Sequence, residues 1–232
     1  MKGWKLLSAA LVGWSLLAAV ADAAESASDE AAKPVRIAAP IDGHIHPSIC
    51  LSPRGVLVVI YGHKNHRDLR ITRSPDGGRT WSEPIPIGKG SGVRLDAETD
   101  VIALRDGRLY AALRGDRVPM HYATSSDEGL TWSAVQDIGF PGHCPHFTRL
   151  STGEILLCHR LPLTSLHVSR DDGATWQGPC QVDTTPGAYP STVELKDGTV
   201  LIVYYEEGER SAVRARRFRL SSHGPEFLEL KP

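Results

Sequence analysis

The sequence predicts an all-β protein, a β-propeller of about four four-stranded blades. Three observations lead to this fold class. An eight-residue box recurs three times, a tight glycine turn recurs four times, and no segment after the N-terminal leader has the apolar spacing of a helix. Units of about 45–50 residues that return in this way are typical of propeller blades.

The repeated box reads S-x-D-x-G-x-T-W. It occupies residues 74–81, 125–132 and 169–176, and its tryptophans lie 51 and 44 residues apart. Its Ser and Asp side chains can accept hydrogen bonds from backbone N–H groups just downstream, and its Gly permits a positive φ. We interpret the box as a structural turn between two strands, with its Trp packed between neighbouring sheets. We place no chemistry on it.

The second repeat is a tight turn that precedes an apolar strand. Its glycines are Gly55, Gly107, Gly153 and Gly198, at steps of 52, 46 and 45 residues. Such turns join antiparallel strands in hairpins, so each unit reads strand, turn, strand, strand, box, strand. The fourth unit has no box. Because an open sheet edge is a liability, its outer strand should come either from residues 35–38 or from residues 227–230.

The N-terminus has the features of a secretory signal. Lys2 and Lys5 precede an apolar run over residues 6–20, and Ala21-Asp22-Ala23 has the form of a cleavage site. The run is short for a membrane span. We therefore expect a protein that is secreted or periplasmic after cleavage, without a stable membrane anchor.

The chain divides into three expected parts: a signal peptide at 1–23, a disordered spacer at 24–34 and the propeller domain at 35–232. The last part is long enough to bury one good core. A formal net charge of −1 lacks the excess of positive charge that is typical of nucleic-acid-binding proteins. We expect no cofactor and no metal, and the sequence does not fix the oligomeric state.

The four cysteines are Cys50, Cys144, Cys158 and Cys180. Their spacings match no zinc pattern. Export would permit disulfides, but a chain of this size does not require them. The sequence favours free thiols and assigns no pair.

Counting from the turn glycines places polar side chains at one end of the propeller. Nine residues before the glycines lie His46, Glu98, Cys144 and Tyr189, and seven residues after them lie Gly62, Arg114, Arg160 and Tyr205. A hairpin brings these two positions together, so Glu98 should neighbour Arg114, and Tyr189 should neighbour Tyr205 and Glu206. An arginine cluster suits an anionic ligand, because guanidinium and carboxylate match in a two-point fork. Ordinary ion pairs at blade ends are the alternative.

At these residues the sequence resembles the sialidase (neuraminidase) superfamily, which is described by its BNR repeats or Asp boxes. The resemblance covers roughly residues 40–222. The segment from Glu98 to Arg114 resembles the one that carries the family's catalytic Glu and one Arg of its substrate triad. Residues 187–191 and 204–206 resemble those that carry the nucleophilic Tyr and a supporting Glu.

The resemblance implies retaining hydrolysis of a terminal sialic acid or a similar anionic sugar. Tyr189 would attack and Glu98 would take its proton, because a neutral Tyr avoids bringing an anionic nucleophile to an anionic substrate. Arg114 and Arg160 would bind the substrate carboxylate. Glu206 would brace an arginine.

Two further roles follow from the resemblance. Proton transfer to the leaving group needs an acid, and Asp68 is the candidate in the first blade. The family's first triad Arg falls where this chain reads residues 44–48, H-I-H-P-S, so His46 takes that place among the substrate-binding residues. Sialidases also have six blades, whereas this chain has repeats for four.

Two other functions remain open at this stage. His44, His46, His143 and His146 all fall at blade entrances. With an Arg and a Tyr they could serve a lyase or hydrolase that acts on a uronate, or they could bind a metal. A propeller that binds a glycan without turnover needs the arginines but no nucleophile.

Overall fold

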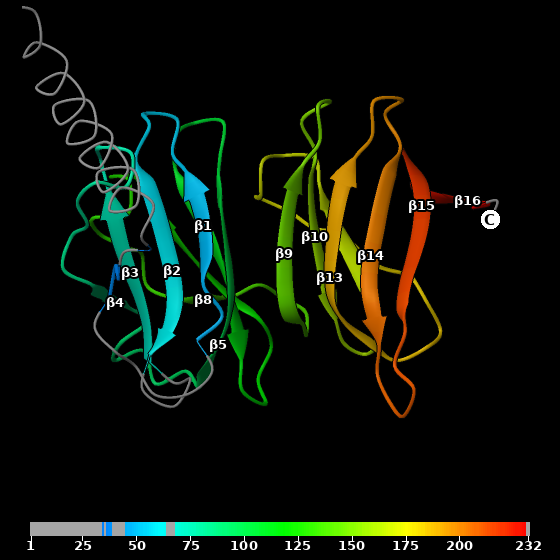
Figure 1. Ribbon diagram of the computed structural model, residues 1–232, viewed down its shortest axis with the longest axis horizontal. Coiled ribbons are helices and arrows are strands. Elements are labelled where there is room, and N and C mark those ends of the chain that lie inside the picture. Colours follow the sequence, from blue (N-terminus) through cyan, green and yellow to red (C-terminus); the bar gives the residue numbers. More distant parts are fainter. Residues whose placement is uncertain (1–33, 35, 39–44, 64–67, 231–232) are drawn as a thin grey trace, which may run out of the picture. The chain divides into compact units, whose positions relative to one another are not determined.

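The computed structural model describes residues 34, 36–38, 45–63 and 68–230. The strands of this part of the chain lie in one compact unit, residues 38–232, and they form four antiparallel four-stranded sheets (Figure 1). Each sheet is a meander, since consecutive strands are hydrogen-bonded neighbours. The predicted all-β propeller fold is confirmed. The predicted signal peptide and most of the predicted spacer lie outside the described residues.

The first sheet contains β1 (Ser48–Leu51), β2 (Leu57–His63), β3 (Asp68–Ser74) and β4 (Ile85–Ile87). The second contains β5 (Leu95–Ala103), β6 (Leu109–Gly115), β7 (His121–Ser125) and β8 (Gln136–Asp137). The third contains β9 (His143–Arg149), β10 (Ile155–Arg160), β11 (Ser165–Ser169) and β12 (Gln177–Gln181). The fourth contains β13 (Gly187–Glu194), β14 (Val200–Glu206), β15 (Val213–Ser221) and β16 (Gly224–Leu228). Among the described residues, no helix is long and apolar enough to cross a membrane.

The turn glycines behave as the sequence predicts. Gly55, Gly107, Gly153 and Gly198 all have positive φ, from 74° to 107°, a conformation that costs glycine nothing. Each of them joins the first strand of a sheet to the second.

The three boxes are structural turns, also as predicted. In the second box, Gly129 N donates to Ser125 Oγ at 2.8 Å and Thr131 N donates to Asp127 Oδ1 at 2.8 Å. The other two boxes repeat both bonds. The indole of Trp176 lies against Tyr110 of the preceding sheet, with 6.1 Å between ring centroids.

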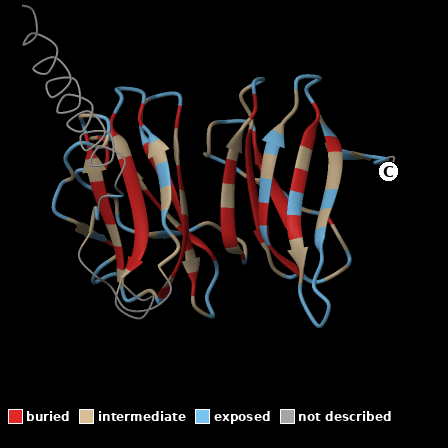
Figure 2. Cartoon of the chain, viewed as in Figure 1, coloured by how far each residue is buried: buried red, intermediate tan, exposed pale blue. Residues whose placement is uncertain are grey.

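The core consists of three apolar layers, each between consecutive sheets. Val58 and Ile60 of β2 meet Leu109 and Leu113 of β6 in the first layer. The second and third layers repeat this packing between sheets two and three and between sheets three and four. Figure 2 shows the corresponding buried bands along the strands. Burial of one such Leu or Ile contributes about 1.5–3 kcal/mol.

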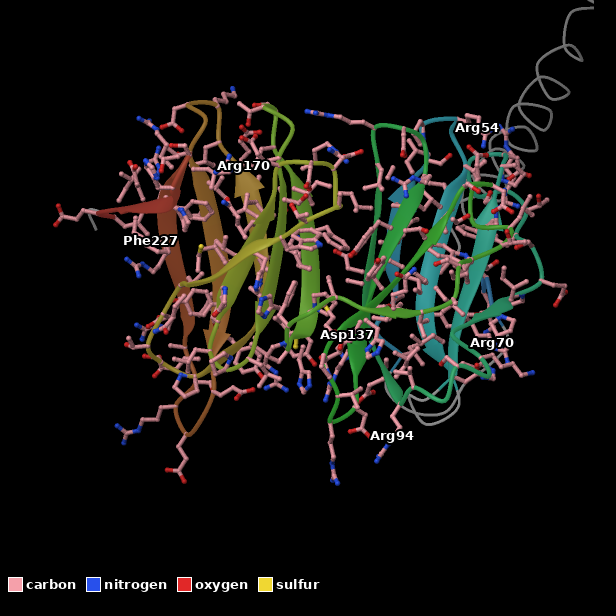
Figure 3. The ribbon with its side chains drawn as sticks, turned by 180° about the vertical axis from the view of Figure 1, so that it is seen from behind. Arg54, Arg70, Arg94, Asp137, Arg170 and Phe227 are labelled. Carbon is pink, nitrogen blue, oxygen red and sulfur yellow. The ribbon has the colours of Figure 1, made fainter. Side chains whose placement is uncertain are left out.

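The outer strand of the fourth sheet is β16, so the second of the two sequence alternatives is correct. Phe227 of β16 packs edge-on against Phe218, with 5.8 Å between centroids. Figure 3 labels Phe227 on this strand. The guanidinium of Arg216 lies 3.9 Å from the centre of the Phe227 ring. The C-terminal hairpin therefore replaces the missing box.

Two histidines are buried without a charge partner beside Phe140. His159 Nε2 lies 2.8 Å from His167 Nδ1, and Phe140 stacks on the His167 ring. Burial lowers the pKa of His159 to about 3 and that of His167 to about 4. Both rings are therefore neutral at neutral pH.

This pair predicts acid sensitivity. A histidine whose folded pKa is lowered favours the folded state above its unfolded pKa of about 6.5, and it costs stability as pH falls below that value, because the unfolded chain then binds the extra proton. The free energy of unfolding should fall between pH 7 and pH 5. The fall should be about 1–2 kcal/mol smaller in His159→Gln, in urea titrations at both pH values. His223→Gln, at an exposed position, is the control. Equal losses in all three proteins would contradict the argument.

Candidate functional site

The site lies where the first strands of the sheets begin. In β5, β9 and β13 the pairing register shifts near this end. His46, Cys144 and Tyr189, which hold equivalent positions in three sheets, have positive φ of 32°, 52° and 49°. A bulge with an unusual φ turns a side chain out of the regular alternation. The backbone thus redirects one side chain from each of these sheets.

A pocket of about 160 Å³ lies among these side chains. It is lined by His46, Pro47, Glu98, Thr99, Cys144, Pro145, His146, Tyr189 and Pro190. All four residues that the sequence placed nine positions before a turn glycine are among them. The prediction that these positions converge is confirmed.

Glu98 lines this pocket and is only 5% exposed. Its Oε1 accepts a hydrogen bond from Tyr189 Oη at 2.8 Å. Its Oε2 lies 2.9 Å from Arg114 Nη1 and also accepts bonds from the backbone N–H of Cys144 at 2.9 Å and from its thiol at 3.2 Å. One carboxylate therefore joins the second, third and fourth sheets.

These contacts set the ionisation of the pair. Burial alone would raise the pKa of Glu98, but the bond from Tyr189, the charge of Arg114 and the bonds from Cys144 outweigh it and hold that pKa below its usual value. Burial and the neighbouring Glu98 carboxylate both raise the pKa of Tyr189. The resting state is therefore a carboxylate that accepts a bond from a neutral phenol.

Tyr189 remains accessible although its hydroxyl is held. Its side chain is 40% exposed. Its ring stacks on His46 on one side, with 5.3 Å between centroids, and on Tyr205 on the other, at 5.9 Å. His46 Nε2 also lies 3.3 Å from Tyr189 Oη. The predicted neighbour Tyr205 is thus in place, and His46 contacts the hydroxyl directly.

The two arginines are both in ion pairs. Arg114 lies between Glu98 and Asp96, whose Oδ2 is 3.5 Å away. Arg160 pairs with Glu207. Burial alone would lower the pKa of Arg160, but Cys144, Glu207 and other nearby groups raise it.

Glu206 has a different partner from the one expected for a brace at this site. Its carboxylate pairs with Arg214, 3.1 Å away. The next residue, Glu207, holds Arg160, and sequence reasoning missed it. Glu207 follows the last residue of β14, so strand alternation could not predict its direction.

Asp68 is engaged outside the lining of the pocket. Its Oδ2 lies 2.6 Å from Arg70 Nη2 and 3.4 Å from His63 Nδ1. Arg70 therefore already supplies the counter-charge of this carboxylate.

The histidines separate into three groups. His46 and His146 line the pocket, and His143 pairs in register with Arg160. His44 lies outside the described residues. Burial and the charge of Arg114 lower the pKa of His143, so this ring is neutral. In the part of the chain that the structure describes, no three His, Cys, Asp or Glu side chains are grouped to hold a metal ion.

A second carboxylate, that of Asp100 in β5, links the second sheet to the first and the third. It accepts bonds from Ser48 Oγ of the first sheet and from Phe147 N of the third, the latter at 2.6 Å. His146 Nδ1 lies 3.9 Å from its Oδ2.

The four cysteines are free thiols, in agreement with the sequence preference.

Comparison with known proteins agrees with this fold. Residues 17–202 match the model of a family described as the BNR repeat-like domain. Sialidases from two strains of Vibrio cholerae serotype O1 are 25% identical over 190 residues, which is 64% of this chain and 24% of theirs. The chain thus spans about a quarter of the length of these relatives.

Solved structures show the same propeller fold. An α-L-arabinanase from Penicillium chrysogenum, complexed with arabinobiose, aligns with a TM-score of 0.59 at 18% identity over 75% of this chain and 62% of that one. A GH93 α-L-arabinofuranosidase of Fusarium graminearum with arabinobiose gives 0.58 at 14% identity, over 75% and 61%. A protein of unknown function from Dyadobacter fermentans gives 0.61 at 18% identity, over 80% and 63%.

The Glu98–Arg114 pair predicts a pH-dependent loss of stability. Arg114→Met would leave a buried carboxylate without its cation, at a cost of about 3–5 kcal/mol at pH 7. The wild-type pair contributes above the unfolded pKa of Glu98 and loses its contribution as pH falls through the lowered folded pKa. The difference in unfolding free energy between wild type and variant should therefore shrink towards pH 4.

Arg108→Met is the matched control, because Arg108 pairs with Asp106 at 2.6 Å with both side chains about half exposed. Exposed pairs contribute about 1 kcal/mol or less. Equal losses in the two variants at pH 7 would contradict the burial argument.

Proposed function

The chain belongs to the BNR repeat-like domain family, and from that premise we propose that it is a sialidase-like glycoside hydrolase. Its substrate would be a glycan that ends in sialic acid or a similar anionic sugar. It would act outside the cytoplasm, after cleavage of the signal peptide expected at residues 1–23. The observation that carries the proposal is the 2.8 Å hydrogen bond from Tyr189 Oη to Glu98 Oε1.

The chemistry follows from the direction of that bond. As Tyr189 Oη attacks the anomeric carbon, its proton passes to Glu98 Oε1 and the bond to the leaving oxygen breaks. Water then attacks the same carbon and gives its proton to the acid that had protonated the leaving oxygen. The bond between the sugar and Tyr189 Oη breaks, and the proton held by Glu98 returns to that oxygen. The exposed ring gives a substrate access to Oη. A neutral phenol is a weak nucleophile, so it needs a base in contact to accept its proton.

The arginines support recognition of an anion. A substrate carboxylate could take over contacts that Glu207 now makes to Arg160. Arg114 is less available, because its partner Glu98 has a separate role. A substrate carboxylate must compete with the protein carboxylates that already pair with these arginines. This competition favours substrates whose carboxylate binds an arginine through both oxygens.

The leaving oxygen also needs a proton. Asp68 is the residue that the family resemblance assigns to this step, but its contacts with Arg70 and His63 argue for a structural role. His146, which lines the pocket, is the alternative.

Binding without turnover is the second candidate. It is favoured by His46, which stacks on Tyr189 where the family resemblance calls for an Arg, and by the ion-paired state of the other two arginines. The curated relatives are named as sialidases, and two solved neighbours hold arabinobiose. A neutral furanoside therefore belongs in the same assay.

The decisive measurement is release of a fluorogenic aglycone from an α-sialoside, with an α-L-arabinofuranoside in parallel. We expect Tyr189→Phe and Glu98→Gln to lower kcat about 10²–10⁴-fold. Tyr205→Phe should change it little, because its hydroxyl faces Glu207 at 3.4 Å.

The alternatives give different results. Glycan binding with no turnover of either substrate would replace the hydrolase with a lectin. New ultraviolet absorbance from a uronate polysaccharide would indicate a lyase. Full activity in Tyr189→Phe would refute the proposed nucleophile.

A further inference from the structure

Each sheet packs against the next through equivalent positions. We call the forward face of a sheet the side that carries the third and fifth residues after its turn glycine. In the four sheets these residues are Val58 and Ile60, Tyr110 and Ala112, Leu156 and Cys158, and Leu201 and Val203. In the first three sheets all six are at most 3% exposed, because the next sheet covers them.

The fourth sheet presents the same face without such a cover. Val203 is 38% exposed, and Val193, which pairs with Leu201, is 52% exposed. Val213 of β15 is 83% exposed, and Ala215 pairs with Val203 on the same side. Figure 2 shows exposed segments along β13 and β14. Two arginines of β15 share this face. Arg217 is paired with Asp197, and the exposed Arg219 lies opposite Glu226 in the strand register, so each positive charge beside the apolar strip lies next to an acidic residue.

The first sheet has the complementary feature. The sixth residue before the turn glycine belongs to the backward face, and in the second and third sheets it is Val101 or Phe147, only 4% and 8% exposed. In the first sheet it is Ile49, which is 58% exposed, and Leu51 beside it is 59% exposed. Val59 and Tyr61 of β2 are buried, so the exposed part of this face is the β1 strip.

We propose that a second copy of this chain docks head to tail, with its β1 strip (Ile49 and Leu51) on the forward face of the fourth sheet (Val193, Leu201 and Val203). Three such junctions already exist within the chain, and the proposed one repeats their use of a forward face against a backward face. Contiguous exposed apolar side chains mark interaction surfaces. A contact between two different faces is heterologous and leaves one free face of each kind on every pair.

The test uses one charge on each face of the full chain. In sedimentation velocity across a dilution series, the wild-type chain should associate beyond the monomer, whereas Val203→Asp and Ile49→Asp should each sediment as monomers. A mixture of the two variants should form a 1:1 heterodimer, because the unaltered forward face of one fits the unaltered backward face of the other. Leu130→Asp is the control, since Leu130 is 57% exposed and lies in a box away from both faces.

Several results would overturn the proposal. A wild-type chain that stays monomeric would do so, and so would association that survives Val203→Asp. If Ile49→Asp still associates while Val203→Asp does not, the forward faces meet each other instead. Far-ultraviolet circular dichroism like that of the wild type confirms that each variant is folded, as expected for exposed positions.

Discussion

One buried carboxylate, that of Glu98, holds the polar end of this protein together. It receives a cation from its own sheet, two donors from the third sheet and the phenol of the fourth. A carboxylate that is 5% exposed would be unfavourable without such partners. Its four contacts therefore fix both the arrangement of the strand ends and the position of Tyr189.

The apolar packing between sheets makes that meeting possible. Each sheet places small and branched residues on one face and receives the opposite face of its neighbour. Such an interface tolerates little change in volume, so it fixes the distance from one sheet to the next. The bulges at the start of the inner strands then act locally, by turning Cys144 and Tyr189 towards Glu98 instead of leaving them in regular alternation. The packed layers fix the distance between sheets, and the unusual φ angles fix the direction of the side chains at the strand ends.

Much of this arrangement could be predicted from the sequence, because it depends on counting. The turn glycines give a reference in each unit, and positions counted from them brought His46, Glu98, Cys144 and Tyr189 together. Counting from the glycines no longer predicts the direction of a side chain once the chain has left a strand. Glu207 lies one residue beyond β14, and its direction depends on the turn that follows.

Two other features also lay beyond the sequence. The thiol bond from Cys144 depends on a bulge that adds a residue to one strand, which no spacing reveals. The outer strand of the fourth sheet had two candidates of similar composition, and only tertiary pairing chose β16.

The charges at the site constrain what the pocket can bind. Arg114 and Arg160 face three carboxylates, Asp96, Glu98 and Glu207, so the cluster has no excess of positive charge. An anionic sugar must therefore displace a protein carboxylate before it can pair with an arginine. Its net gain in binding free energy is only the difference between the new ion pair and the one that it replaces. A neutral sugar does not compete with these carboxylates, but it also forms no two-point ion pair with a guanidinium. Affinity at this site should thus depend less on net charge than on how well a ligand stacks beside Tyr189 and His46.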